Sequence, residues 1–156
     1  AKTIVPLFFG ANDIYFFGES AMRSYVREQC ERVTKRGGIP LPGTVIPRGD
    51  TNAVNAGFEA ARLAYNDWLR ANYQLFAPAV IDYGADPVMG LFATTSNLTY
   101  FQSDKIHPTA AGNALLAAVA YPVVRWALEI AGTTYTGPNS AAALPLRRRF
   151  YTPSFR

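Results

Sequence analysis

The sequence contains very few of the residues that build metal sites and disulfides. Of its 156 residues, one is histidine and one is cysteine. The single cysteine, Cys30, excludes an internal disulfide and every zinc site that needs several cysteines. Because Cys30 falls at helical spacing with Met22 and Val26, we expect it to be a buried core thiol. We expect no cofactor and no metal.

Long apolar runs and a broad basic surface are also missing. No uninterrupted apolar run approaches the ~20 residues that span a bilayer, so we expect no membrane span. The first residues, AKTIVPLFFG, lack the charged start and long apolar region of a signal peptide. The net charge is +4, and Arg147–Arg149 with Arg156 account for it at one end of the chain. The near-neutral remainder argues against nucleic acid as a partner.

What the sequence does contain is enough apolar material for one domain, 49% of its residues. Short apolar runs alternate with helical patterns, which predicts an α/β fold with a parallel sheet. Pro6 weakens the prediction of a strand in the first run, and the middle run, which several prolines interrupt, could hold a second strand. The predicted strands lie within residues 3–9, 39–47 and 79–84, and the predicted helices cover 20–36, 53–76 and 108 to about 131. Ser20 is expected to cap the first helix and Pro108 to occupy the first position of the last.

The composition changes after about residue 131. Thr, Gly, Pro, Ser and Ala dominate there and lead into the stretch LRRRFYTPSFR. We therefore expect residues 1–131 to form part of one domain and residues 132–156 to form an extended tail. The mixture of arginine and aromatic residues suits either a disordered tail or docking on a partner.

Two polar motifs follow or flank the predicted strands. The first is GAND, Gly10 to Asp13, directly after the first strand, and the second is DKIHP, Asp104 to Pro108. In open α/β sheets, functional sites form at the carboxyl edge of the strands, where such residues gather. Each motif alone is also compatible with ordinary turn chemistry.

Together the motifs resemble blocks III and V of the SGNH, or GDSL-type, hydrolases. The stretch YNDWLRANYQLFAPAVIDYGADP, 65–87, is similar to the long helix and strand that precede the last block in that family. The stretch FQSDKIHPTAAGNALLAAVA, 101–120, closely matches that block itself. The resemblance covers roughly residues 3 to 130. It implies a three-layer α/β/α sandwich with a parallel, flavodoxin-like sheet, of which this chain is the C-terminal part without the N-terminal strands.

The resemblance also implies roles for individual residues. His107 would be the general base, and Asp104 would hold its tautomer and stabilise the imidazolium. Asn12 would donate its side-chain amide to the tetrahedral oxyanion, and Gly10 would let the backbone turn tightly beside that oxyanion hole. Asp13 would orient the loop and take no part in the chemistry.

The family's nucleophile is not found in this sequence. Its block I, Gly-Asp-Ser, and its block II glycine are both absent. Ser20, in FFGES, is better explained as a helix cap, and Ser103 would point away from His107. Because the nucleophile strand would lie beside the GAND strand, its absence would leave an apolar sheet edge open. We therefore expect the serine to come from an N-terminal portion of the same domain, as a separate chain, a cleaved piece or a segment outside this sequence.

Two functions from different classes remain. The first is a serine esterase or acyl hydrolase acting on an ester substrate, with acylated carbohydrate as one such substrate, and a secreted or extracellular location is favoured. The second is a non-catalytic structural or binding module of a larger assembly, such as a virion or surface appendage. A small-molecule-binding flavodoxin-type domain is a weaker third, because no phosphate loop is present. The space beside His107 discriminates between the first two, since an apolar side chain filling it would favour the structural module.

Overall fold

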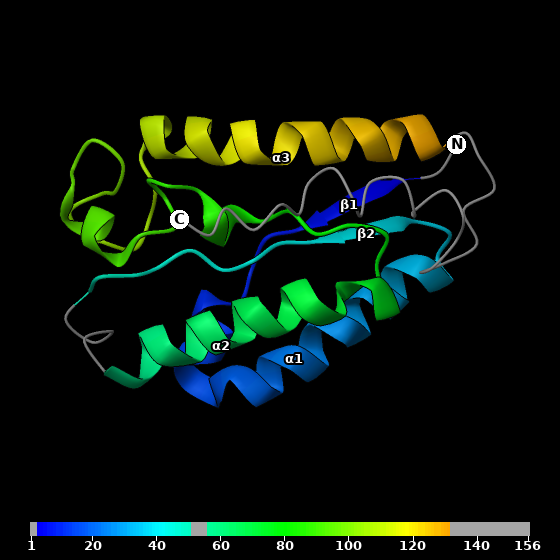
Figure 1. The fold of residues 1–156 in the computed structure, drawn as a ribbon, viewed down its shortest axis with the longest axis horizontal. Helices are drawn as coiled ribbons and strands as arrows, with labels where there is room; N and C mark the ends of the chain where they lie inside the picture. The colour runs from blue at the N-terminus through cyan, green and yellow to red at the C-terminus, as the bar shows by residue number, and fades with distance from the viewer. Residues whose placement is uncertain (1–2, 51–55, 132–156) are drawn as a thin grey trace.

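The computed structural model describes residues 3–50 and 56–131 of the chain. Its strands and helices alternate from β1 to α2, as the sequence pattern predicts, and α3 follows without a third strand element between (Figure 1). The elements are β1 (Ile4–Leu7), α1 (Ala11–Lys35), β2 (Ile39–Pro42), α2 (Ala56–Asn72) and α3 (Ala110–Ala131), with short 3-10 turns between α2 and α3.

The sheet is small and parallel. β1 pairs with β2 in a register that places Ile4 opposite Ile39 and Leu7 opposite Pro42. The prediction of a strand at 79–84 is wrong in extent. Of these residues only Ile81 pairs with the strand layer, through a parallel bridge to Gly43. The N–H of Ile81 donates to the carbonyl of Pro42 at 2.9 Å. Beyond Ile81 the chain turns into a 3-10 helix at Tyr83–Ala85, which ends the pairing.

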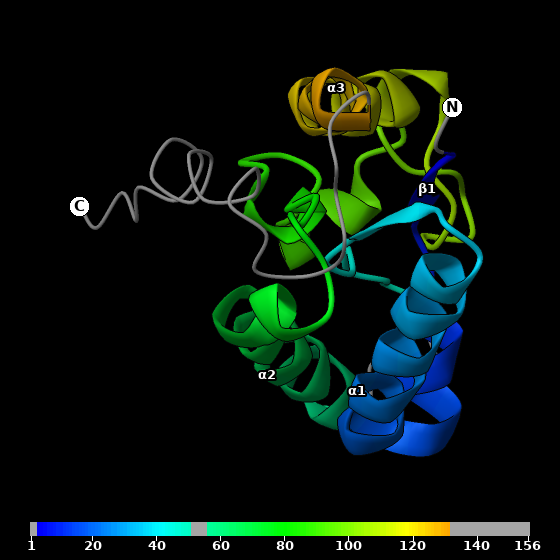
Figure 2. The ribbon, with the colours of Figure 1, turned by 90° about the vertical axis from the view of Figure 1, so that its right-hand side faces the viewer.

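The helices lie on both faces of the strand layer. α1 and α2 cover one face and α3 covers the other, as the end-on view also shows (Figure 2). The buried apolar residues accordingly form two clusters, one against α3 and one between α1, α2 and the strands. The mixed α/β class and the parallel pairing that the sequence predicts are confirmed.

The first helix differs from its predicted start. α1 begins at Ala11, well before Ser20, and Gly18 interrupts it with non-helical angles (φ 81°, ψ 169°). Ser20 lies inside the helix after this break, so the prediction that it is the N-cap is wrong. Within the GAND motif, Gly10 is the N-cap, and Ala11, Asn12 and Asp13 lie in the first helical turn. Cys30 is fully buried, which confirms the core thiol, and burial raises its pKa to about 12.

The last helix begins slightly later than predicted. Pro108 is not its first residue, because Pro108 pairs with Phe101 in an antiparallel bridge that holds it extended. Thr109 caps the helix instead, its hydroxyl accepting the N–H of Gly112 at 3.2 Å. For the second helix, the predicted residues 53–55 lie outside the described part of the chain, and the predicted end is replaced by a 3-10 turn at Tyr73–Leu75.

α3 is apolar along much of its length. Its segment Ala110–Glu129 has a mean hydropathy of 1.3, and within residues 3–50 and 56–131 it is the one helix long and apolar enough to cross a bilayer. One such helix is weak evidence of a span, since core helices pass the same test. Here Leu116, Val123 and Ala127 pack into the core cluster against the strands.

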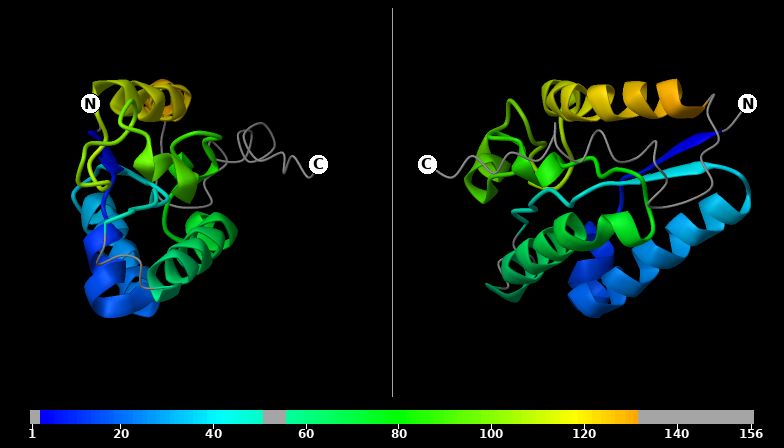
Figure 3. Two further views of the ribbon diagram at one scale, coloured as in Figure 1. Left: turned by 90° about the vertical axis from the view of Figure 1, so that its left-hand side faces the viewer. Right: turned by 45° about the vertical axis from the view of Figure 1, so that its right-hand side comes forward.

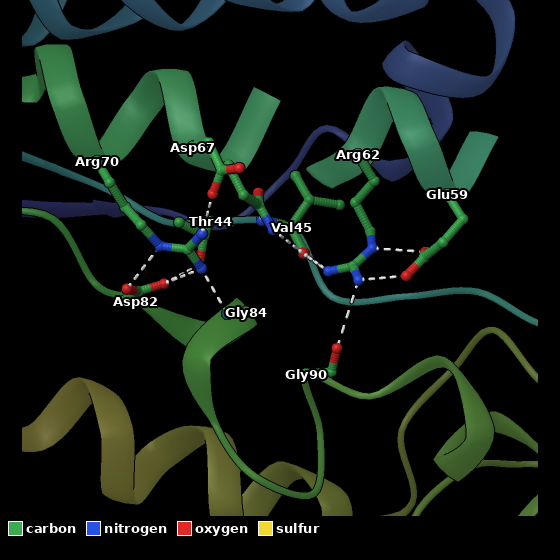
Figure 4. A network of polar contacts seen from close by, with 10 residues as sticks. Thr44, Val45, Glu59, Arg62, Asp67, Arg70, Asp82, Gly84 and Gly90 are labelled. Atoms are coloured by element: carbon green, nitrogen blue, oxygen red, sulfur yellow. Dashed lines mark hydrogen bonds and ion pairs between the residues drawn. The ribbon is translucent and has the colours of Figure 1, made fainter. Parts of the chain in front are cut away.

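Polar side chains of α2 hold the chain that follows β2 (Figure 4). Asn66 is fully buried, accepts the N–H of Val45 at 2.8 Å and donates to the carbonyl of Val45 at 2.9 Å. Arg62, also buried, donates to the same carbonyl at 2.9 Å and to that of Gly90 at 3.4 Å. The carboxamide of Asn66 thus makes the paired contacts that a neighbouring strand would otherwise supply.

Arg70 of α2 makes a second clamp one turn further along. Its guanidinium binds both carboxylate oxygens of Asp82, each at 2.9 Å. Asp82 also accepts the hydroxyl of Thr44 at 2.9 Å, so the end of the Ile81 bridge is tied to α2 and to the segment after β2. These contacts fix the course of residues 44–50 towards the loops at the carboxyl end of the strands.

Replacing Asn66 by leucine tests the first clamp. The side chain keeps its volume but leaves the buried N–H of Val45 without an acceptor, so we expect the free energy of unfolding to fall by about 2–3 kcal/mol. Urea denaturation measures this loss. Gln74 provides the control, because its side chain makes a single, solvent-exposed hydrogen bond to the backbone of Ala71. Gln74→Ala should change stability by less than about 0.5 kcal/mol. An equal loss in both variants would contradict the assigned role of Asn66.

Candidate active site

Asp104 and His107 lie at the tip of a tight loop that precedes α3. The base of the loop is closed by the Phe101–Pro108 bridge and by the N–H of Thr109, which donates to the carbonyl of Tyr100 at 2.9 Å. Phe101 is fully buried and anchors the loop in the core. This arrangement presents the tip at the end of the molecule where the strands terminate and where α2 and α3 begin (Figure 3).

The two side chains contact each other directly. Asp104 Oδ2 lies 2.7 Å from His107 Nδ1. The other oxygen, Oδ1, accepts the backbone N–H of Ile106 at 2.9 Å and of His107 at 3.0 Å. Lys105, between them, adopts a left-handed conformation (φ 59°), which is uncommon for a residue with a side chain. The hydrogen bond from His107, followed by these backbone bonds, lowers the pKa of Asp104 to about 2.

The outer face of the imidazole is open. The side chain of His107 is 69% exposed and that of Asp104 is 42% exposed. Nδ1 is engaged by the carboxylate, and Nε2 has no hydrogen-bond partner among the described residues. An imidazole this exposed is not covered by an apolar side chain in the described part of the chain. Its Nε2 can therefore exchange a proton with a group that approaches from outside.

Gly10 and Asn12 form the turn from β1 into α1. Gly10 has φ 119°, a conformation that residues with side chains rarely adopt, so the backbone here favours glycine. A Cβ there would also lie 2.7 Å from the Cε of Met22, which would have to move. The carbonyl of Gly10 accepts the N–H of Ile14 at 2.8 Å, which begins the helix. Asn12 is exposed in that first turn, and its Oδ1 accepts a hydrogen bond from Arg48 at 2.8 Å. Asp13 lies in the same turn, where the positive end of the helix dipole stabilises a carboxylate.

The segment Arg48–Asp50 links the two motifs. Arg48 reaches Asn12 through its side chain, and the N–H of Gly49 donates to the carbonyl of Lys105 at 2.8 Å. The GAND turn and the Asp104–His107 loop therefore share one neighbouring segment, although they are far apart in the sequence. The sequence pattern does not point to this segment, because Arg-Gly-Asp after an apolar run is typical of an ordinary polar loop beyond a strand.

Arg48 is itself tightly held. Its side chain is 8% exposed and binds both oxygens of Asp50, with Nε to Oδ1 at 2.9 Å and Nη2 to Oδ2 at 3.0 Å. The guanidinium lies over the ring of Tyr15, 4.8 Å from its centroid, and near that of Phe58. Burial, a two-bond ion pair and a stacked ring together restrict Arg48 to one conformation.

No serine completes the arrangement within residues 3–50 and 56–131. Ser20 lies inside α1, Ser103 is exposed beside Asp104, and neither hydrogen-bonds to His107. The same residues contain no group of three or more His, Cys, Asp or Glu side chains close enough to share a metal ion. No family model matches the chain, and no curated protein matches it.

The carboxyl titration of Asp104 tests the Asp104–His107 contact. Its folded pKa of about 2 lies below the ordinary value of 3.8, so the contact stabilises the loop above about pH 4 and is lost as the pH falls towards 2. We expect the ¹³Cγ shift of Asp104 to titrate in that low range. In His107→Ala the largest cause is removed, so the midpoint should move up, though the backbone bonds to Oδ1 remain. An unchanged midpoint would contradict the contact.

Adding a methyl group at Gly49 tests the link between the motifs. A Cβ there would lie 2.1 Å from the hydroxyl oxygen and 2.7 Å from the Cβ of Thr95, a buried residue. We expect Gly49→Ala to lower the free energy of unfolding by about 1–3 kcal/mol and to shift the His107 backbone resonances. Ser96→Ala, an exposed change on the neighbouring turn, is the control and should leave both unchanged. Unperturbed His107 resonances in Gly49→Ala would show that the link does not hold the loop.

Proposed function

We propose that the chain is the C-terminal part of a serine ester hydrolase of the SGNH type, with the three-layer α/β/α sandwich of that family. The observation that carries the proposal is the Asp104–His107 pair, joined at 2.7 Å with Nε2 of the imidazole open. A carboxylate fixed by two backbone N–H groups and bonded to Nδ1 orients a histidine to act as a general base through Nε2. Asn12, tied to the same loop through residues 48–50, supports the proposal as the oxyanion donor.

The chemistry follows from these positions. Nε2 of His107 takes the proton of a serine hydroxyl while the serine oxygen bonds to the ester carbonyl carbon. The carbonyl oxygen becomes an oxyanion, which accepts a hydrogen bond from the amide of Asn12. His107 returns the proton to the leaving alcohol as the ester C–O bond breaks, and Asp104 stabilises the imidazolium between these steps. Water then cleaves the acyl-serine by the same route.

The serine is proposed to come from an N-terminal portion of the same domain. β1 pairs with β2 on one edge only, and no strand among the described residues occupies its other edge. Three aromatic side chains in the stretch that follows β1 are exposed: Phe8 just after the strand, and Phe16 and Phe17 in the first part of α1. A strand added beside β1 would satisfy the free backbone groups and carry its serine to the edge where Asn12 lies. The substrate is an ester, with acylated carbohydrate as one class, and the reaction needs no cofactor.

The alternative is a non-catalytic structural or binding module of a larger assembly. The exposed Phe16 and Phe17, at 68% and 73%, favour it, because large exposed aromatic side chains are typical of docking surfaces. The open imidazole favours the enzyme instead, since an apolar side chain filling the space beside His107 was the arrangement expected of a structural module. Activity measurements separate the two.

The test is ester hydrolysis by this chain together with its N-terminal portion, with p-nitrophenyl acetate as substrate. We expect His107→Ala to lower the rate at least about 1000-fold, because it removes the general base. Ser103→Ala is the matched control on the same loop and should retain the rate, as should Ser20→Ala. A fluorophosphonate probe followed by peptide mass analysis should label a serine outside residues 1–156.

Three outcomes would overturn the proposal. One is labelling of Ser20 or Ser103, which would place the nucleophile in this chain. Another is hydrolysis that survives His107→Ala. The third is a folded assembly that neither hydrolyses esters nor reacts with the probe, which would favour the structural module.

A further inference from the structure

We propose that Arg48, clamped by Asp50, is a positioning residue that turns the side-chain amide of Asn12 towards the reacting carbonyl. The inference rests on the proposed function and adds to it residues that the sequence motifs do not contain. It starts from one contact, the 2.8 Å hydrogen bond between Arg48 Nη1 and Asn12 Oδ1.

The contact decides which way the amide points. An asparagine side chain can present either its oxygen or its NH₂ group to a neighbour, but a guanidinium has donors only and stays protonated. The atom that faces Arg48 must therefore be the oxygen. The NH₂ group of Asn12 then points away from Arg48, and among the described residues it has no acceptor. A free, directed donor is what an oxyanion hole requires.

The clamp keeps this orientation without adding net charge. Asp50 binds Nε and Nη2 of Arg48, so the pair is close to neutral and only Nη1 is directed at Asn12. Stacking over Tyr15 and burial remove other conformations of the guanidinium. Arg48 therefore acts on Asn12 through orientation and through polarisation of the amide, because a charged donor on its oxygen makes its N–H groups stronger donors.

The same segment also contacts the loop that carries the proposed base, His107. Gly49, the next residue, donates its N–H to Lys105 between Asp104 and His107. One short piece of backbone thus carries the residue that orients the oxyanion donor and the contact that holds the base loop. Thr95 packs against Gly49 and leaves no room for a side chain there, which keeps the two loops close.

A double-mutant cycle in the assembled, active protein tests the inference. Asn12→Ala should lower kcat about 100- to 1000-fold, as removal of a single oxyanion donor does. Arg48→Met should lower kcat about 10- to 100-fold with little change in KM, because the donor remains but is misdirected. Since Arg48 acts through Asn12, the double variant should be no slower than Asn12→Ala alone. Arg48→Lys, which keeps one donor, should recover part of the rate.

Arg32→Met is the control, because it removes an ion pair, with Glu28, between two exposed side chains of α1. It should leave stability nearly unchanged. It should also leave kcat unchanged, both alone and in combination with Asn12→Ala. A second measurement does not depend on activity: the ¹⁵Nδ2 and proton resonances of the Asn12 amide should move in Arg48→Met and stay in place in Arg32→Met.

The outcomes separate this inference from the proposed function. Additive losses in the Asn12/Arg48 cycle, or Asn12 resonances that do not respond to Arg48→Met, would overturn the positioning role. A protein that hydrolyses no ester, but whose Asn12 amide resonances respond to Arg48→Met, would overturn the proposed function and retain the orientation of Asn12 by Arg48.

Discussion

The arrangement depends on how the backbone after β2 is held. Residues 43–49 are buried but have little sheet pairing, so their polar backbone groups need other partners. The carboxamide of Asn66 bonds to both the N–H and the carbonyl of Val45, and Arg62 donates to that carbonyl as well. Because these side chains stand on α2, the helix decides where the segment runs. Arg48 and Gly49 reach Asn12 and Lys105 only because that course is fixed.

The site is thus assembled by a loop that carries none of the motif residues. Asp104 and His107 form a self-contained pair, closed by backbone bonds within their own loop. Asn12 is placed by the turn at Gly10 and oriented by Arg48. What brings the pair and the amide into one neighbourhood is the contact of Gly49 with Lys105. The proposed chemistry therefore rests on short-range geometry within each motif and on one tertiary contact between them.

Part of the fold was predictable because its signals are local. The apolar runs predicted β1 and β2, the spacing of Met22, Val26 and Cys30 predicted a buried helix face, and all three are confirmed. The errors fall where tertiary contacts override local preference. Pairing with Phe101 holds Pro108 out of α3, and the turn held by Asp82 shortens the third strand to Ile81. The early start of α1 was missed because GAND reads as a turn.

The sequence by itself predicted the order of the first four elements, and it placed Asp104 and His107 three residues apart in one short loop, a spacing at which the two side chains can meet. It also determined that Gly10 is needed where β1 becomes α1. Only the tertiary structure decided which atom of Asn12 is free, since that depends on Arg48, a donor from another part of the chain. The tertiary structure also decided how the two motifs are held near each other. That depends on the contact between Gly49 and Lys105, and a contact between residues so far apart produces no pattern in the sequence.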